Sequence, residues 1–154
     1  MATILLPPDF KEFLRLLNSH EVEYLVIGGY AVNYHGYPRA TGDIDIWMGI
    51  GVGNGEKMAA VLREFGFSRA TPELFAEPGK VVRMGLPPLR IEVLTSISGV
   101  EFSQCFRNRV VADIGGVPVN LIGMEDLRAN KKASGRLKDL ADIEALTKGR
   151  GAGR

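Results

Sequence analysis

The most constraining stretch of this 154-residue chain is residues 43–48, which read DIDIWM. Apolar and acidic side chains alternate at its start, the period-two pattern of a β-strand that buries one face. Aspartate is disfavoured in strands, and an unpaired buried carboxylate is costly enough that such groups normally pair or bind a metal ion. We therefore expect Ile44 and Ile46 to enter the core. Asp43 and Asp45, roughly 7 Å apart, would line a site on the opposite face.

A third acidic side chain follows the same alternation farther along the chain. In residues 89–97, LRIEVLTSI, Glu92 lies between two apolar residues and so faces away from the core. If this strand pairs beside residues 43–48, all three carboxylates share one sheet face. Like charges this close repel unless a cation lies between them, and oxygen ligands with no His or Cys nearby favour Mg²⁺ or Mn²⁺. The alternative for Glu92 is a solvated strand face.

A glycine pair, Gly28-Gly29, directly follows the predicted strand at residues 22–27. Glycine lets the backbone approach a ligand closely, and amides at a helix N-terminus can hold phosphate. Taken alone the signal is weak, because strand-to-helix turns often use glycine. Residues 51–57, GVGNGEK, look like a phosphate loop but fail the spacing, since no Ser or Thr follows Lys57.

The remaining pattern alternates between helical and strand periods. Helices are expected at residues 9–20 (with Asp9 as N-cap), 30–36, 56–67, 124–134 and 136–148. Further strands are expected at residues 80–86 and 89–97, and in a hairpin over 107–123 that turns at Gly115-Gly116. This order predicts an α+β fold, a small mixed β-sheet with helices packed on it. We expect one domain over residues 1–148 and a flexible tail over 149–154.

Composition narrows the possible classes. The net charge is +1, which argues against extended nucleic-acid binding, although lysines and arginines gather in residues 128–154 and suit an anionic ligand. The one cysteine, Cys105, can build neither an internal disulfide nor a thiolate metal site, and is expected to be a small buried hydrophobe. No signal peptide and no bilayer-spanning apolar run is evident, so we expect a cytoplasmic protein without membrane contact.

Two separated motifs point to one family. Residues 28–48, GGYAVNYHGYPRATGDIDIWM, resemble the signature of the DNA polymerase beta-like nucleotidyltransferase superfamily: two small residues after a strand, a short helix, then Thr-x-Asp-hydrophobic-Asp. Residues 131–146, KKASGRLKDLADIEAL, resemble the closing segment of its small bacterial abortive-infection, type IV toxin-like members. The motifs occur in the family's order, and the resemblance extends from residue 24 to residue 146.

The resemblance implies transfer of a nucleoside monophosphate from an NTP to a hydroxyl acceptor, which could be RNA, protein or a small molecule. It also implies a possible toxin role with a cognate antitoxin as partner; monomer and homodimer both stay open. The catalytic and metal-binding carboxylates implied for Mg²⁺ (or Mn²⁺) are Asp43, Asp45 and Glu92. The implied nucleotide-binding residues are Gly28, Gly29, Thr41, Lys131 and Arg136.

Two other functions stay open. Gly29 stands where many catalytic members of the family have serine, and Glu92 where the third acid is often aspartate. A catalytically weak NTP- or metal-binding regulatory domain of the same fold is therefore an alternative. A metal-dependent phosphodiesterase or nuclease is another, but a nuclease has no triphosphate for a glycine pair to hold. Trp47, on the aspartate face by alternation, could stack a base, but we favour a core position.

Overall fold

A six-stranded mixed sheet forms the centre of the protein in the computed structural model, which describes residues 6–36, 42–86, 88–136, 139–144 and 146. Its strand order is β3-β4-β2-β1-β6-β5. The strands are β1 (Tyr24–Ile27), β2 (Ile44–Met48), β3 (Val81–Met84), β4 (Ile91–Leu94), β5 (Val110–Ile114) and β6 (Val117–Leu121). The β2–β4 and β1–β6 pairs are parallel, and the other neighbours are antiparallel. The predicted α+β fold with a mixed sheet is confirmed.

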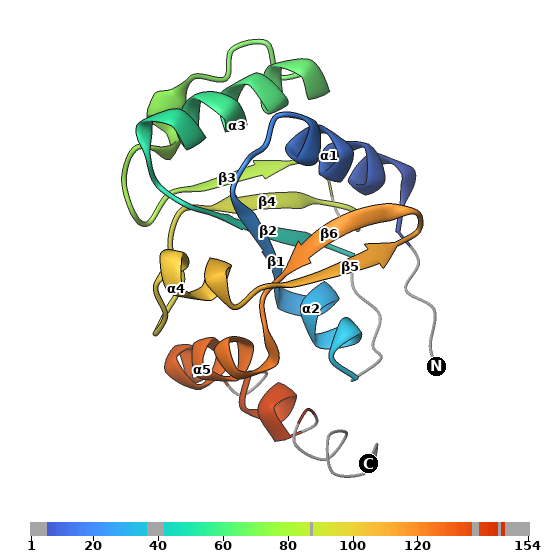
Figure 1. The fold of residues 1–154 in the computed structure, drawn as a ribbon, viewed down its shortest axis with the longest axis vertical. Helices are drawn as coiled ribbons and strands as arrows, with labels where there is room; N and C mark the ends of the chain where they lie inside the picture. Colours follow the sequence, from blue (N-terminus) through green and yellow to red (C-terminus); the bar gives the residue numbers. More distant parts are fainter. Residues whose placement is uncertain (1–5, 37–41, 87, 137–138, 145, 147–154) are drawn as a thin grey trace.

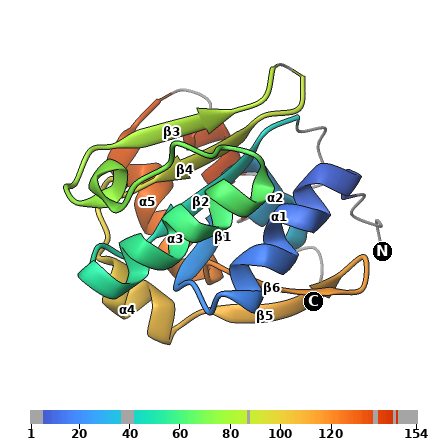
Figure 2. The same cartoon turned by 90° about the horizontal axis from the view of Figure 1, so that it is seen from above.

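Helices lie on both sides of this sheet (Figures 1 and 2). One side carries α1 (Pro8–Ser19) and α3 (Val52–Phe65), which lie side by side. The other side carries α2 (Gly28–Tyr34), α4 (Phe102–Arg107) and α5 (Met124–Ser134), and residues 139–144 are also helical. A short 3-10 helix, η1 (Pro72–Phe75), follows α3. Within the described residues, no helix has the length and apolar character needed to cross a membrane.

The core forms between the sheet and the apolar stripes of the helices. The buried stripe of α1, at helical spacing, consists of Phe10, Phe13, Leu14 and Leu17. The alternate buried positions of β2 and β4 are Ile44, Ile46, Met48, Ile91 and Val93. On the opposite face Trp47 is only 2% exposed and meets Phe102 edge to face, with ring centroids 5.2 Å apart. Trp47 therefore fills the core, as favoured from the sequence.

Three helices begin earlier than predicted, and α2 does so by two residues, at Gly28. Asp9 is not the N-cap, because α1 already begins at Pro8, which needs no partner for a backbone N–H. α3 begins at Val52, four residues before the predicted start at residue 56. The side chain of Asn54 accepts a hydrogen bond from the Glu23 amide at 2.8 Å and donates one to the Gly49 carbonyl at 2.7 Å. These contacts anchor the first turn, so tertiary structure overrides the low helix propensity of its glycines.

The sequence did not predict α4 or η1, which are too short to establish a helical period. Cys105, in α4, is 1% exposed, as expected for a small buried hydrophobe. The hairpin between β5 and β6 does turn at Gly115 and Gly116, whose φ angles of +61° and +85° suit a tight two-residue turn. The predicted tail at residues 149–154 lies outside the described residues.

Candidate active site

Strand β2 presents the predicted acidic face. Asp45 lies between the buried Ile44 and Ile46 and is partly exposed on the opposite face, while Asp43 directly precedes the strand. The alternation of residues 43–48 therefore divides the strand between two faces, as predicted. One side of β2 belongs to the core and the other side carries carboxylates toward the helices α2 and α5.

The parallel pairing of β2 with β4 brings Glu92 directly beside Asp45. The backbone amide of Ile44 donates to the carbonyl of Arg90 at 2.9 Å, which fixes this register at the start of both strands. Because side chains that face each other across adjacent strands point to the same side, Glu92 joins the two aspartates. The register confirms that Asp45 and Glu92 share one sheet face, and Asp43, which precedes the paired residues, bonds the arginine on which all three charges act.

Gly28 lies against this carboxylate group. It has a left-handed φ of +67°, and a Cβ built on it would overlap Oδ2 of Asp45. Ile27, the last residue of β1, is in register with Asp45, so the chain passes the carboxylate just as it turns into α2. Any side chain at this position would displace Asp45. Gly29 is buried in the first turn of α2, and its predicted contact with phosphate stays a prediction.

Two arginines that the sequence analysis missed contact these acids. Nη2 of Arg90 donates to Oδ2 of Asp43 at 3.2 Å, and Nε of Arg83 donates to Oε2 of Glu92 at 3.1 Å. The hydrogen bond from Arg90 to Asp43, together with the charges of Asp43, Glu92 and Asp45, raises the pKa of Arg90. All three carboxylates therefore act on one guanidinium group.

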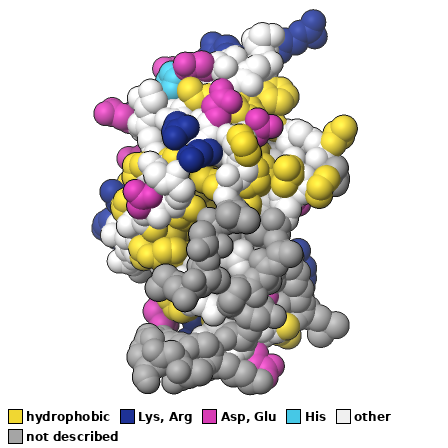
Figure 3. Space-filling model, turned by 90° about the vertical axis from the view of Figure 1, so that its right-hand side faces the viewer, with side chains coloured by type: hydrophobic (Ala, Val, Ile, Leu, Met, Phe, Trp, Pro, Cys, Tyr) yellow, Lys and Arg dark blue, Asp and Glu magenta, His cyan; other side chains and the backbone are white. Residues whose placement is uncertain are grey.

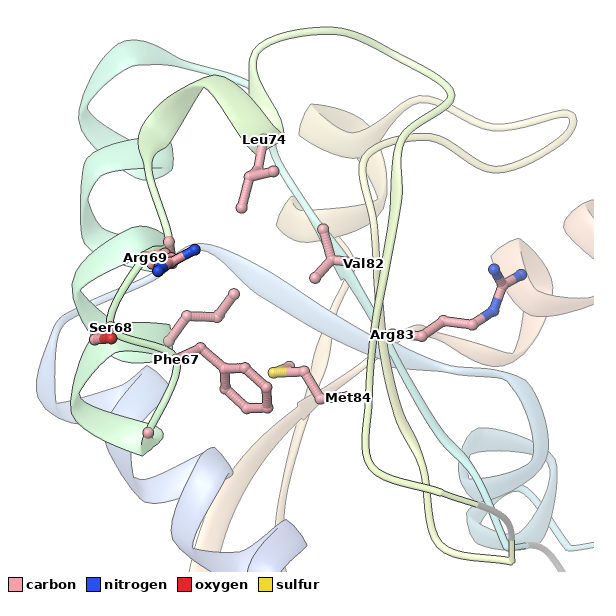
Figure 4. A pocket seen from close by; sticks show the side chains of 10 residues that line it. Phe67, Ser68, Arg69, Leu74, Val82, Arg83 and Met84 are labelled. Atoms are coloured by element: carbon pink, nitrogen blue, oxygen red, sulfur yellow. The ribbon is translucent and has the colours of Figure 1, made fainter.

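Arg83 reaches this face because β3 alternates as well. Figure 4 shows the other side of β3, where Val82 and Met84 line an apolar pocket while Arg83 points away from it. Met84 pairs with Ile91 and Arg83 with Glu92 in the sheet. The apolar pocket and the carboxylates thus lie on opposite sides of the sheet. A signal for Arg90 was present in the sequence, since RIEV at residues 90–93 alternates in step with DIDI.

The C-terminal motif forms a buried ion cluster. Nζ of Lys131 lies 3.2 Å from Oδ1 of Asp139 and 3.0 Å from Oδ2 of Asp142, and all three residues are at most 5% exposed. Nε of Arg136 donates to Oδ2 of Asp139 at 2.6 Å. Burial alone would raise the pKa of Asp139, but hydrogen bonds from Arg136, Ser134 and Lys131 outweigh it and hold that pKa well below its usual range.

The two predicted phosphate ligands in this cluster, Lys131 and Arg136, differ in exposure and in their partners. The ammonium of Lys131 already has two buried carboxylate partners, whereas the Arg136 side chain is 71% exposed. The bond to Asp139 raises the pKa of Arg136, and the charge of Asp45 adds to the shift. Arg136 therefore lies within electrostatic reach of the carboxylate site. Lys131 is buried and shares the partner Asp139 with it. Thr41, the remaining predicted nucleotide ligand, lies outside the described residues.

No group of three or more His, Cys, Asp and Glu side chains in the described part of the chain is already arranged around one metal position. Asp43 and Glu92 instead contact arginines. The chemistry of the donor set still suits a hard divalent cation, because every candidate ligand is a carboxylate oxygen. The metal-binding roles of Asp43, Asp45 and Glu92 thus stay predictions.

Solved structures with a similar fold place the architecture among the nucleotidyltransferases. A protein of Thermotoga maritima described as a candidate nucleotidyltransferase is 13% identical with a TM-score of 0.57, and 94% of each chain is covered. The antibiotic-resistance factor ANT(2″)-Ia has a TM-score of 0.59 at 14% identity, over 94% of this chain and 83% of that one. The lincosamide antibiotic adenylyltransferase LnuA has a TM-score of 0.55 at 14% identity, over 93% and 97%.

The family follows from the sequence itself. Residues 8–151 match the family described as nucleotidyl transferase of unknown function (DUF2204), and the chain belongs to this family. The predicted enzyme class, a nucleotidyltransferase, is confirmed, and it implies a nucleotide donor and an acceptor. No curated protein matches the chain. The family match and the solved structures do not identify the toxin-like subgroup, so membership of that subgroup stays a prediction.

Proposed function

We propose that this chain is a metal-dependent transferase that moves a nucleoside monophosphate from an NTP to a hydroxyl acceptor. The observation that carries the proposal is the register of β2 and β4, which sets Asp45 beside Glu92 with Asp43 at the end of the same face. Family membership supports the reaction class. The contact of Gly28 with Asp45 supports the site, because it brings backbone amides next to the carboxylates.

Asp43, Asp45 and Glu92 would hold the divalent cation, Mg²⁺ or Mn²⁺. When bound, such an ion neutralises phosphate charge during in-line displacement at phosphorus. In the transfer, a bond forms between the acceptor oxygen and the α-phosphorus, and the bond from that phosphorus to its bridging oxygen breaks, so that pyrophosphate leaves. Glu92 is the proposed acceptor of the hydroxyl proton.

The phosphate contacts come from several parts of the chain. Gly28 and Gly29 offer backbone amides at the start of α2, and Thr41 precedes Asp43 in the motif. Arg136 is the proposed side-chain contact for the leaving pyrophosphate, because its guanidinium is exposed yet acts electrostatically with Asp45. We assign Lys131 to holding Asp139, which in turn orients Arg136.

The acceptor is proposed only as a class. Two of the structural neighbours are named as enzymes of antibiotic modification, an adenylyltransferase of lincosamides and ANT(2″)-Ia in complex with adenylyl-2″-tobramycin, which supports a small-molecule hydroxyl. The resemblance to toxin-like members supports RNA or protein, with an antitoxin as partner. On the side drawn in Figure 3, described basic side chains are interspersed with acidic and apolar ones. The net charge of +1 argues against a long nucleic-acid duplex as the acceptor, whereas a small molecule or an RNA end remains compatible with it.

The direct test is incubation with each α-³²P-labelled NTP, Mg²⁺ or Mn²⁺, and pools of cellular RNA, protein and small hydroxyl compounds. We expect label to move to one pool with the wild type and not with the Asp43→Ala, Asp45→Ala double variant. Equal transfer by both proteins would contradict the proposal. Metal-dependent NTP binding without transfer to any pool would favour the regulatory domain, an alternative supported by the arginine partners of Asp43 and Glu92.

A further inference from the structure

Arg90 bonds one carboxylate of the site and lies within electrostatic reach of the other two. It directly precedes β4, and its carbonyl accepts a hydrogen bond from the Ile44 amide, so its backbone is fixed to β2. Its guanidinium bonds Asp43 at 3.2 Å and interacts with the charges of Glu92 and Asp45. Its side chain is 32% exposed, which leaves it reachable by a ligand.

Close packing of two backbone segments determines the position of Arg90. A Cβ at Gly42 would overlap the carbonyl oxygen of Pro88. The segment before Asp43 and the segment before Arg90 therefore pack backbone against backbone, which requires glycine at position 42. This contact brings the two side chains together before either strand begins.

One atom of Arg90 lacks a partner. Its Nε is buried and has no hydrogen-bond partner in the described part of the chain. A buried N–H without a partner is costly, and a guanidinium can donate two parallel bonds to a phosphate. Asp43 thus accepts one bond from Nη2, and Nε is a further donor that becomes available to an anionic oxygen when the side chain moves.

The charge balance points in the same direction. Among the described residues, Asp43 pairs with Arg90 and Glu92 pairs with Arg83, and the charge of Arg136 acts together with that of Asp45. The acids are largely neutralised by the protein itself, so a divalent cation must compete with Arg90 for Asp43. A bound triphosphate offers Arg90 other anionic oxygens. It therefore lowers the free energy needed to break the ion pair between Arg90 and Asp43.

We propose that Arg90 is an internal counter-ion of the carboxylate site: it pairs with Asp43 when no nucleotide is bound and moves to the nucleotide's phosphates when one binds. Cation and nucleotide then load together, and the bare cation binds weakly. This inference rests on the proposed function, since it takes Asp43, Asp45 and Glu92 as the cation's ligands. It assigns a nucleotide-binding role to a residue outside the motifs.

The test measures binding rather than turnover. Free Mn²⁺ is followed by electron paramagnetic resonance during titration of the wild type, Arg90→Gln and the control Arg69→Gln. Arg69 is an exposed arginine beside the apolar pocket on the other side of the sheet. Without nucleotide, we expect Arg90→Gln to bind Mn²⁺ about tenfold more tightly than the wild type, within the range typical of coupled sites. With Mn²⁺ and a non-hydrolysable ATP analogue, we expect Arg90→Gln to bind the nucleotide about tenfold more weakly. Arg69→Gln should change neither value.

Unchanged or weaker Mn²⁺ binding by Arg90→Gln would overturn the inference. If circular dichroism shows that this variant does not fold, Arg90→Lys is the second test. Lysine keeps the positive charge but lacks the parallel N–H donors of the guanidinium. Mn²⁺ affinity should therefore stay near that of the wild type, while nucleotide affinity falls. Nucleotide affinity equal to that of the wild type in Arg90→Lys would also overturn it.

Adding Asp43→Asn and Asp45→Asn to each protein separates this failure from failure of the proposed function. If the two aspartates do not affect Mn²⁺ binding, the proposed site is wrong. If they do and Arg90→Gln has no effect, only the counter-ion role is wrong.

Discussion

Replacing Gly28 by alanine, together with a control glycine, tests whether the position of Asp45 matters for the reaction apart from the strain of the backbone. Gly28 has a φ of +67°, and an added Cβ would overlap Oδ2 of Asp45. The left-handed conformation costs an alanine about 1–2 kcal/mol of folding free energy. The overlap adds a displacement of the Asp45 carboxylate, and a shift of about 1 Å in a positioned group can lower a rate about 100-fold.

Gly116 supplies the matched control. Its φ is +85°, and a Cβ built there has nothing within 4 Å. Gly116→Ala should therefore carry the backbone cost of about 1–2 kcal/mol without touching the site. Urea unfolding gives the free energy of unfolding of both variants, and label transfer from α-³²P NTP gives their activity. We expect both to be destabilised, and only Gly28→Ala to lose about 100-fold in transfer.

Two results would refute this reasoning. Full transfer by Gly28→Ala would mean that the position of Asp45 beside the glycine turn does not matter for the reaction. An equal loss of transfer in Gly116→Ala would mean that lowered stability, and not displacement of Asp45, causes the effect.

Three further predictions concern the buried polar groups. Lys131→Met leaves Asp139 and Asp142 without their common cation, so we expect a loss of about 3–5 kcal/mol in the free energy of unfolding, measured with urea at pH 7. Because the folded pKa of Asp139 is lowered, its contribution is full above the ordinary carboxyl pKa of about 4 and is lost as the pH falls further. Asp139→Asn should therefore be much less stable than the wild type at pH 7, with a smaller difference at pH 3; a difference that grows on acidification would contradict this. The Tyr24 hydroxyl donates to Asn18 at 2.9 Å and accepts from the Asn120 amide at 3.3 Å. Tyr24→Phe should cost about 1–2 kcal/mol of stability without changing transfer, and should remove a tyrosine whose pKa burial raises to about 12, seen by ultraviolet titration.

The acidic face could be predicted because its signal is local. Alternation in residues 43–48 and around Glu92 assigns each side chain to a face without knowledge of the sheet order. The sequence did not establish that the strand of residues 43–48 and the strand of Glu92 are neighbours. The pairing of β2 with β4 in the structure shows that they are. The glycine pair was predicted to let the backbone approach a ligand, which stays a prediction; the structure shows that Gly28 makes room for Asp45.

The partners of these acids could not be predicted in the same way. Arg90 alternates in step with Glu92, but which acid it meets depends on the parallel register and on the contact between Gly42 and Pro88. Lys131 lies in a stretch rich in basic residues, where exposure is the usual expectation. It is buried because the chain turns at Gly135, with a φ of +66°, and brings Asp139 back over it.

The central claim is that Asp43, Asp45 and Glu92 form one cation and nucleotide site. The most direct measurement is anomalous X-ray diffraction from crystals grown with Mn²⁺ and a non-hydrolysable NTP analogue. We expect a manganese peak within about 2.0–2.6 Å of carboxylate oxygens from these residues, with the analogue's phosphates beside Gly28. A manganese peak on other residues, or an analogue bound on the α1 and α3 side of the sheet, would contradict it.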